Sequence, residues 1–170
     1  MYSENVLIIV GAIVVLGILV IIILLRSKAA PAKTDAPSGP STLPLQLQAY
    51  ERLVILAERI GLRYLIGSQS TEGLSAREYQ AVLVEAIKRE YEYNVSQQIY
   101  VAPKAWEAVQ RLKEQNIYVV NQIGSYLNGD AGGKDLARAL AEYLSGQGDA
   151  GALQQIVMDG LNIEAKKLMH

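Results

Sequence analysis

The sequence predicts an all-α protein made of an N-terminal transmembrane helix, a flexible linker and a cytoplasmic bundle of four or five helices. An uninterrupted apolar run of helix length lies near the N-terminus, and the rest of the chain repeats apolar residues at intervals of three and four. No stretch alternates apolar and polar residues as a half-buried strand does. We therefore expect residues 1–26 to form the anchor, 27–42 the linker and 43–170 the soluble domain.

The apolar run extends from Val6 to Leu25 and contains no charged or polar side chain. Seventeen of its twenty residues are Leu, Ile or Val. A helix of this length covers about 30 Å, which is the hydrocarbon thickness of a bilayer. Since backbone polar groups cannot be left unpaired in lipid, a lone span has to be helical. The predicted partner of this run is the lipid bilayer.

Charged residues on either side of the run predict its orientation. Glu4 is the charged side chain that precedes it, whereas Arg26, Lys28 and Lys33 follow it. By the positive-inside rule the N-terminus lies outside and the C-terminal domain is cytoplasmic. A cleaved secretory signal is the alternative. It is disfavoured by the length of the run, the lack of a basic segment before it and the basic residues directly after it.

The linker has the composition of a mobile tether. Residues 27–42 hold three of the five prolines together with Ala, Ser, Thr and Gly. Such a segment cannot bury enough apolar surface to offset the entropy lost on ordering. Sixteen residues of flexible chain have a root-mean-square reach of about 20 to 25 Å. A tether of this length is long enough for the domain to sit clear of the lipid surface.

Composition restricts the chemistry of the soluble domain. From Leu43 onward there are thirteen Lys or Arg and fifteen Asp or Glu, with no long run of either sign, which argues against a nucleic-acid surface. Cysteine is absent, and the single histidine is His170. Thiolate sites, zinc sites and histidine-dependent catalysis are therefore not expected. We predict no catalytic residue, no metal and no cofactor, although a carboxylate pair hidden in a pocket remains open.

The first helix is expected to begin at Leu43, capped by the Thr42 hydroxyl, with Pro44 in its first turn. Gly61 is expected to end this helix in a left-handed conformation. Residues 62–74 are consistent with either a further helical turn or a short extended segment.

The second helix is expected to start with a capping box formed by Ser75 and Glu78. Its broad apolar face is expected to extend as far as Val95 and Ile99. A third helix is then expected to begin at Pro103, because the helical conformation is disfavoured at the residue before a proline.

Two further helices are expected in the last third of the chain, after a glycine-rich loop. Residues 135–145 form the fourth, and residues 150–169 form the last. The last helix is expected to present the following apolar residues to the bundle: Leu153, Ile156, Val157, Leu161 and Leu168.

Five residues are candidates for an interaction surface. Asn116 is the polar member of a heptad seam in the third helix, where it would fix the register of an oligomer or of an antiparallel seam inside one chain; we favour the second. Tyr91, Tyr93 and Tyr100 cluster where polar and aromatic residues mix, and Trp106 lies one turn before the seam. Tyr and Trp are enriched at binding surfaces, although tyrosines at a bundle edge and a tryptophan in a core are the commoner structural roles.

Two stretches resemble an uncharacterised family of small single-span bacterial membrane proteins. They are LPLQLQAYERL, residues 43–53, and SQQIYVAPKAW, residues 96–106. The resemblance covers residues 43–123 and leaves the last two helices outside it. It implies a setting in the bacterial inner membrane and transfers no catalytic residue.

The first functional hypothesis is a non-enzymatic, membrane-anchored helical module for protein–protein interaction or scaffolding at the cytoplasmic face. The alternative is a membrane-tethered enzyme or small-ligand binder with a pocket between helices. Self-association through the Asn116 seam is a third hypothesis. An exposed aromatic patch over a closed core favours the first, and a deep cleft with converging buried charges favours the second.

Overall fold

The computed structural model describes residues 41–146 and 152–170. The chain divides into two units, Met1–Ser41 and Thr42–His170, and the second is the helical domain. The predicted span from Val6 to Leu25 lies outside the described residues. Within the described ranges, no helix has both the length and the apolar character needed to cross a membrane.

The described part of the chain folds into six α-helices and one short 3-10 helix, without a strand, so the all-α prediction is confirmed. The structure has one helix more than the expected maximum of five. The extra helix is α3, which forms within residues 62–74, where the sequence allowed either a helical turn or an extended segment. The elements are α2 (Leu43–Arg59), α3 (Leu62–Ser68), α4 (Ala76–Tyr93), η1 (Val95–Ile99), α5 (Pro103–Ser125), α6 (Gly133–Gly146) and α7 (Ala152–Lys167).

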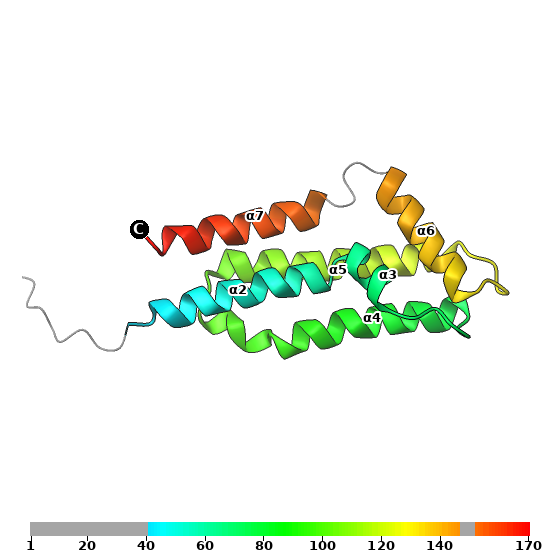
Figure 1. Cartoon of the computed structure of the whole chain (residues 1–170), viewed down its shortest axis with the longest axis horizontal. Coiled ribbons are helices and arrows are strands. Elements are labelled where there is room, and N and C mark those ends of the chain that lie inside the picture. Colours follow the sequence, from blue (N-terminus) through cyan, green and yellow to red (C-terminus); the bar gives the residue numbers. More distant parts are fainter. Residues whose placement is uncertain (1–40, 147–151) are drawn as a thin grey trace, which may run out of the picture. The chain divides into compact units, whose positions relative to one another are not determined.

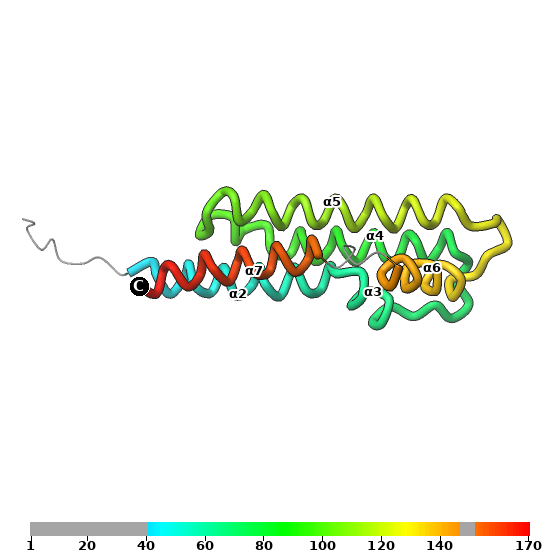
Figure 2. The backbone as a smooth tube through the Cα atoms, turned by 90° about the horizontal axis from the view of Figure 1, so that it is seen from above, coloured from blue at the N-terminus to red at the C-terminus, as the bar shows by residue number. Residues whose placement is uncertain are grey.

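The two longest helices, α4 and α5, form an antiparallel hairpin along most of the domain, and the start of α2 and the end of α7 extend past its η1 end (Figure 1). Helices α2 and α7 lie side by side over one half of this hairpin, and α3 and α6 cover the other half (Figure 2). In the first half α2 contacts both hairpin helices and α7 contacts α5; in the second half α6 contacts both hairpin helices and α3 packs against α6. This arrangement places α7 next to both α2 and α5.

A continuous apolar core fills the space between these helices. Its largest fully buried side chains come from five of the α-helices and from Ile60, which ends α2, and apolar surface of this kind contributes about 25 cal/mol per Å² removed from water. They include Leu53, Leu56, Ile60, Tyr79, Leu83, Ile87, Val109, Leu112, Val120, Leu136, Leu140 and Leu161.

Asn116 lies in this core and is 7% exposed. Its Nδ2 donates a hydrogen bond to the carbonyl oxygen of Ile60 at 2.8 Å. Ile60 is the C-cap of α2, and the last carbonyls of a helix have no partner within the helix itself. The side chain from α5 therefore ties down the end of α2. The seam neighbours Val109, Leu112 and Val119 are buried inside the same chain, as expected for an intramolecular seam.

Two helix ends are formed as the sequence predicts, and two are not. Ser75 and Glu78 make the capping box, in which the Glu78 amide donates to the Ser75 hydroxyl, and the Ser75 amide donates to the Glu78 carboxylate at 2.8 Å. Helix α5 begins at Pro103. The Thr42 side chain, in contrast, makes no capping hydrogen bond. Gly61 has a φ of −63° and begins α3, so the prediction of a left-handed cap is wrong.

The apolar face of the second helix ends earlier than predicted. Asn94, 4% exposed, ends α4, and its Nδ2 donates to the Glu90 carbonyl at 2.9 Å. The chain then tightens into η1, which turns Val95 (45% exposed) and Ile99 (73% exposed) to the surface. Their expected place on the inner face is wrong because the change from α- to 3-10 winding rotates them away from the core.

Helix α7 is held to the domain by a narrow apolar stripe. Val157 and Leu161 are its buried residues, and Leu153 and Leu168 are half-buried. Ile156 is 65% exposed, so its predicted place against the bundle is wrong. One position along a helix rotates the side chain by about 100°, and only one of the two adjacent apolar residues can face the core.

We predict that Asn116→Ala destabilises the domain by about 1 to 3 kcal/mol, because the buried carbonyl of Ile60 loses its donor. Thermal unfolding of the full chain in mild detergent, followed by far-UV circular dichroism, measures the effect. Asn121→Ala is the matched control, since Asn121 is on α5, as Asn116 is, and its side chain accepts an exposed hydrogen bond from Gln80 of α4. Equal losses from the two variants would contradict this role of Asn116.

We also predict that Ser75→Ala costs about 1 kcal/mol through loss of the cap of α4. Hydrogen bonds from the Ser75 side chain and backbone lower the pKa of Glu78 in the folded chain. The stabilisation from the Glu78 carboxylate is therefore present above its ordinary pKa, about 4.3, and is lost as the pH falls through the lower folded value. Unfolding temperatures recorded from neutral to acid pH should show the difference between wild type and Ser75→Ala shrinking, and a constant difference would contradict the prediction.

Candidate functional site

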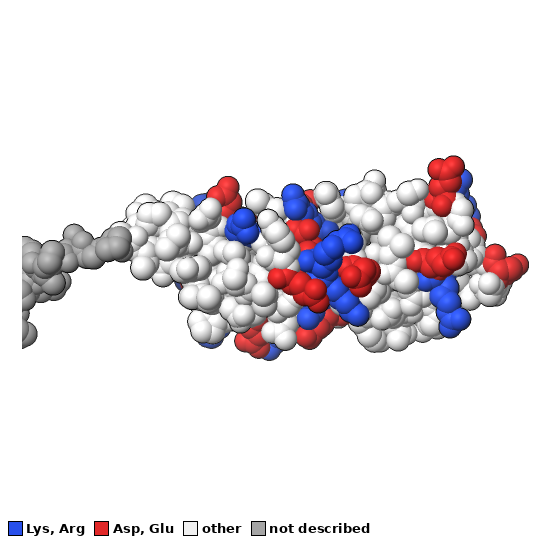
Figure 3. All heavy atoms as spheres, turned by 90° about the horizontal axis from the view of Figure 1, so that it is seen from below, with Lys and Arg blue, Asp and Glu red and all other residues white. Residues whose placement is uncertain are grey.

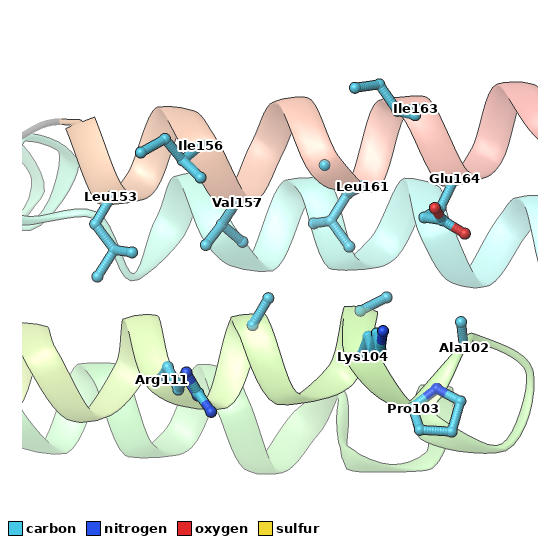
Figure 4. A pocket seen from close by; sticks show the side chains of 13 residues that line it. Ala102, Pro103, Lys104, Arg111, Leu153, Ile156, Val157, Leu161, Ile163 and Glu164 are labelled. Carbon is cyan, nitrogen blue, oxygen red and sulfur yellow. The ribbon is translucent and has the colours of Figure 1, made fainter.

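An apolar groove of about 850 Å³ lies between the first half of α5 and helix α7 (Figure 4). Both walls are helical, so the backbone polar groups of the walls are mostly paired within the helices. The lining residues are Ala102, Pro103, Lys104, Ala105, Ala108 and Arg111 on the α5 side, and Leu153, Ile156, Val157, Gly160, Leu161, Ile163 and Glu164 on the α7 side.

Small side chains leave this groove unfilled. On the α5 side, Ala102, Ala105 and Ala108 present only methyl groups toward α7. On the facing helix, a Cβ added at Gly160 would have no neighbouring atom within 4 Å. Interiors are normally packed to the density of an organic crystal, so this space belongs to the surface and is accessible to a ligand from outside.

Two exposed isoleucines extend the apolar surface of the groove over the outside of α7. Ile156 is 65% exposed and Ile163 is 56% exposed. They are seven residues apart, so they lie on one side of the helix, two turns from each other. Gly160 lies between them and leaves a shallow gap. Large apolar side chains exposed together next to a groove are typical of an interaction site.

The charged groups of the groove are located at its rims. Lys104 and Arg111 lie on the α5 side, and Glu164 lies on the α7 side. Arg111 pairs with Glu107 at 2.6 Å, and Glu164 pairs with Lys167 at 2.6 Å. Both pairs are exposed and contribute little to stability. The groove therefore has an apolar floor, two basic residues on its α5 edge and one acidic residue on its α7 edge.

A second groove, of about 630 Å³, runs along the other side of α7, against α2. Pro44, Leu47 and Val54 line it from α2, and Ala165 and Met169 from the C-terminal part of the chain. Gln48, Glu51 and Asn162 also line this second groove, so helix α7 has an apolar groove on its α5 side and a groove of mixed polarity on its α2 side. This follows from its narrow buried stripe.

The candidate residues from the sequence fall into three places. Tyr91 and Trp106 stack against each other with ring centroids 5.0 Å apart, and the Lys113 ammonium lies 4.3 Å from the Tyr91 ring centroid. Burial, and then the negative charge of Glu114, raise the pKa of the Tyr91 phenol. Both aromatic side chains are half-buried, so this cluster joins the end of α4 to the start of α5.

Tyr93 and Tyr100 are separate from that stack. Tyr93 is 69% exposed, with the guanidinium of Arg52 at 5.7 Å from its ring centroid. Tyr100 is 38% exposed and follows η1. Asn116, the fifth candidate, is in the core and bonded to the end of α2. The structure therefore brings Tyr91 and Trp106 together and places the other three apart.

Among the described residues, no group of His, Cys, Asp or Glu is arranged to hold a metal ion. The buried side-chain polar atom without a hydrogen-bond partner in this part of the chain is the hydroxyl of Tyr79. Burial raises the pKa of Tyr79, which keeps the phenol neutral. It lies within the core between α4 and α6 and not in a groove, so it is not placed to act on a ligand.

The fold and the groove define a class of small all-helical proteins with an exposed apolar site between two helices. The chain belongs to DUF7935, a family of unknown function, whose model matches residues 2–168. This match is longer than the expected resemblance, because it includes the apolar run, α6 and α7. Neither the curated proteins nor the solved structures contain a significant match to the chain.

The sequence did not predict the groove. Ala102, Ala105 and Ala108 have the spacing of an ordinary core-facing stripe, and nothing local shows that the opposite helix leaves space there. One signal was available in α7, where Ile156 and Ile163 form a second apolar stripe beside Val157 and Leu161. A helix with two apolar stripes on different faces needs a second partner.

We predict that Gly160→Ala stabilises the domain by about 1 kcal/mol, because alanine is the better helix former and its Cβ enters open space. Gly133→Ala is the control in α6. There a Cβ would lie 3.2 Å from both the Leu74 carbonyl oxygen and the Tyr79 Cβ, so the same change should destabilise. Thermal unfolding of both variants tests the prediction, and a loss of stability for Gly160→Ala would show that the groove is closed.

Proposed function

We propose that this protein is a non-enzymatic, single-pass membrane protein whose helical domain binds a partner protein at the cytoplasmic face of the bacterial inner membrane. In this proposal, the run from Val6 to Leu25 spans the bilayer with the N-terminus outside. The family match supports the combination of an apolar N-terminal run and a helical domain in one protein, since it covers both. The observation that carries the partner-binding part is the apolar groove between α5 and α7.

The occupant proposed for the groove is one amphipathic helix of another protein. Two helical walls with an apolar floor accept a third helix whose anchoring residues recur every three to four positions. Ile156 and Ile163 would contact the outer turns of that helix. Lys104 and Arg111 on one rim favour acidic residues on the side of the helix facing α5, and Glu164 favours a basic residue on the other side.

The volume of the groove supports a second candidate function, the binding of a small apolar ligand. About 850 Å³ lies within the usual range of ligand pockets. The charged groups Lys104, Arg111 and Glu164 lie at the rims and do not converge on one point, so the groove better fits binding than acid–base chemistry.

The anchor is tested by extraction and by topology. We expect the full chain to stay in the membrane pellet at alkaline pH and to need detergent for release, because its apolar run is held by lipid. A fluorescent protein fused after His170 should be bright, and an alkaline phosphatase fused there should be inactive, as expected in the cytoplasm. Release without detergent would contradict the anchor, and the reverse reporter pattern would contradict the orientation.

The groove is tested by site-specific photocrosslinking in membranes. A photoreactive amino acid at Ile156 should give a discrete adduct whose cross-linked peptide belongs to an amphipathic helix of another protein. The same probe at Tyr126, which is 80% exposed on the far end of α5, is the matched control and should not give this adduct.

Ile163→Glu should abolish the adduct formed at Ile156 while leaving the circular dichroism spectrum unchanged, because Ile163 is exposed. An adduct with a second copy of this chain would replace the proposed partner by self-association. Equal labelling from Ile156 and Tyr126, or an adduct that survives Ile163→Glu, would contradict the groove as the binding site.

A further inference from the structure

Two charge-free segments far apart in sequence meet at one end of the domain. Residues 41–50 and residues 94–103 contain no Lys, Arg, Asp, Glu or His. The fold joins them through the Tyr50 hydroxyl, which accepts a hydrogen bond from the Ala102 amide at 3.1 Å, and through packing of α2 against η1. This is the end at which α2 begins and to which the C-terminal end of α7 returns (Figure 1).

Apolar and aromatic side chains are exposed at this end. Leu45 is 46% exposed, Val95 45%, Ile99 73% and Tyr100 38%, and these four residues are called the tether-end patch. Seen from below, the charged residues gather over the middle of the domain and toward its far end, and few of them lie on this face of the end that carries the start of α2 (Figure 3). Lys166 and Lys167 lie in the last turn of α7, which also returns to this end. No charged group within these two segments has to be desolvated when the patch is covered.

We propose that the tether-end patch rests on the interface of the lipid bilayer, so that the domain stands on the membrane by this end. This inference rests on the proposed function, because it takes the bilayer to be where residues 6–25 hold it. The chain that precedes α2 limits how far the domain can lie from the bilayer. The described domain begins at this end, with Leu43 of α2, and a flexible chain of the sixteen residues 27–42 would have a reach of about 20 to 25 Å.

The chemistry of the patch fits an interface better than a protein core. Tyrosine is enriched at the level of the lipid headgroups, where its ring is buried and its hydroxyl remains in water. Lys104 follows the second charge-free segment, and its long side chain can lie along apolar surface with the ammonium among headgroups. The 3-10 helix η1 presents Val95 and Ile99 on a turn and not along an extended helix face, which suits shallow insertion.

This contact would also position the groove. Ala102 and Pro103 belong to the second charge-free segment and also line the groove between α5 and α7. The α5 end of the groove would then open close to the membrane surface. A partner helix entering there would be a juxtamembrane segment.

The experiment uses the absence of cysteine from the sequence. Ile99→Cys and Tyr126→Cys, both at exposed positions, are labelled with an environment-sensitive fluorophore in the full chain and reconstituted into vesicles of phosphatidylethanolamine and phosphatidylglycerol. We expect a blue-shifted emission for the label at position 99, quenched by nitroxide carried on lipid headgroups. The label at position 126 should have the emission of a label in water and should not be quenched. Val95→Asp added to the Ile99→Cys chain should reduce the quenching.

Flotation of the vesicles distinguishes failure of the membrane anchor from failure of the contact between the tether-end patch and lipid. If the full chain does not float, the membrane anchor of the proposed function fails, and this inference fails with it. If the chain floats but the label at position 99 matches the label at position 126, the anchor holds and the patch does not contact lipid. A blue shift without quenching by nitroxide lipid would show that protein covers the patch, and it would also overturn the inference.

Discussion

The packing of α4 against α5 is the constraint on which the rest of the domain depends. Helices α2 and α7, of 17 and 16 residues, lie toward the η1 end of the hairpin and extend past it, so they do not reach its other half. Since α2 and α7 lie over one half of the hairpin, the other half needs separate helices, and α3 and α6 meet that need. The Asn116 side chain fixes the point where α2 gives way to α3 by binding the carbonyl of Ile60.

The grooves follow from the same division of the hairpin. Helix α7 follows α6 in the chain and returns to the half of the hairpin that α2 also covers. Its buried residues are Val157 and Leu161. The small side chains of α5 opposite it leave the space unfilled. A more fully packed α7 would bury more surface and stabilise the domain further, so the open groove leaves stability unused, as the proposed binding role would require.

Local signals were sufficient to predict much of the fold. The Ser75–Glu78 capping box and Pro103 each determine a helix start within a few residues of sequence, and the structure has them as predicted. The wrong predictions concern helix ends whose conformation depends on contacts with residues distant in the sequence. Asn94 is buried and ends α4 before Val95, and Gly61 is the N-cap of a helix whose Leu62 and Leu65 are buried in the core. The second apolar stripe of α7 is visible in the sequence, but the candidate site was not predicted from it, because long-range packing decides which of the two stripes faces the core.

The claim that α7 packs on α2 and α5 through a narrow buried stripe and leaves a groove beside it is tested most directly by hydrogen exchange. Segments with few buried contacts open at lower free energy than the core. In the full chain reconstituted in lipid, amides of residues 152–167 should exchange faster than those at the centres of α4 and α5. Protection of α7 equal to that of α5 would show a fully packed helix, and it would contradict both the groove and the function proposed for it.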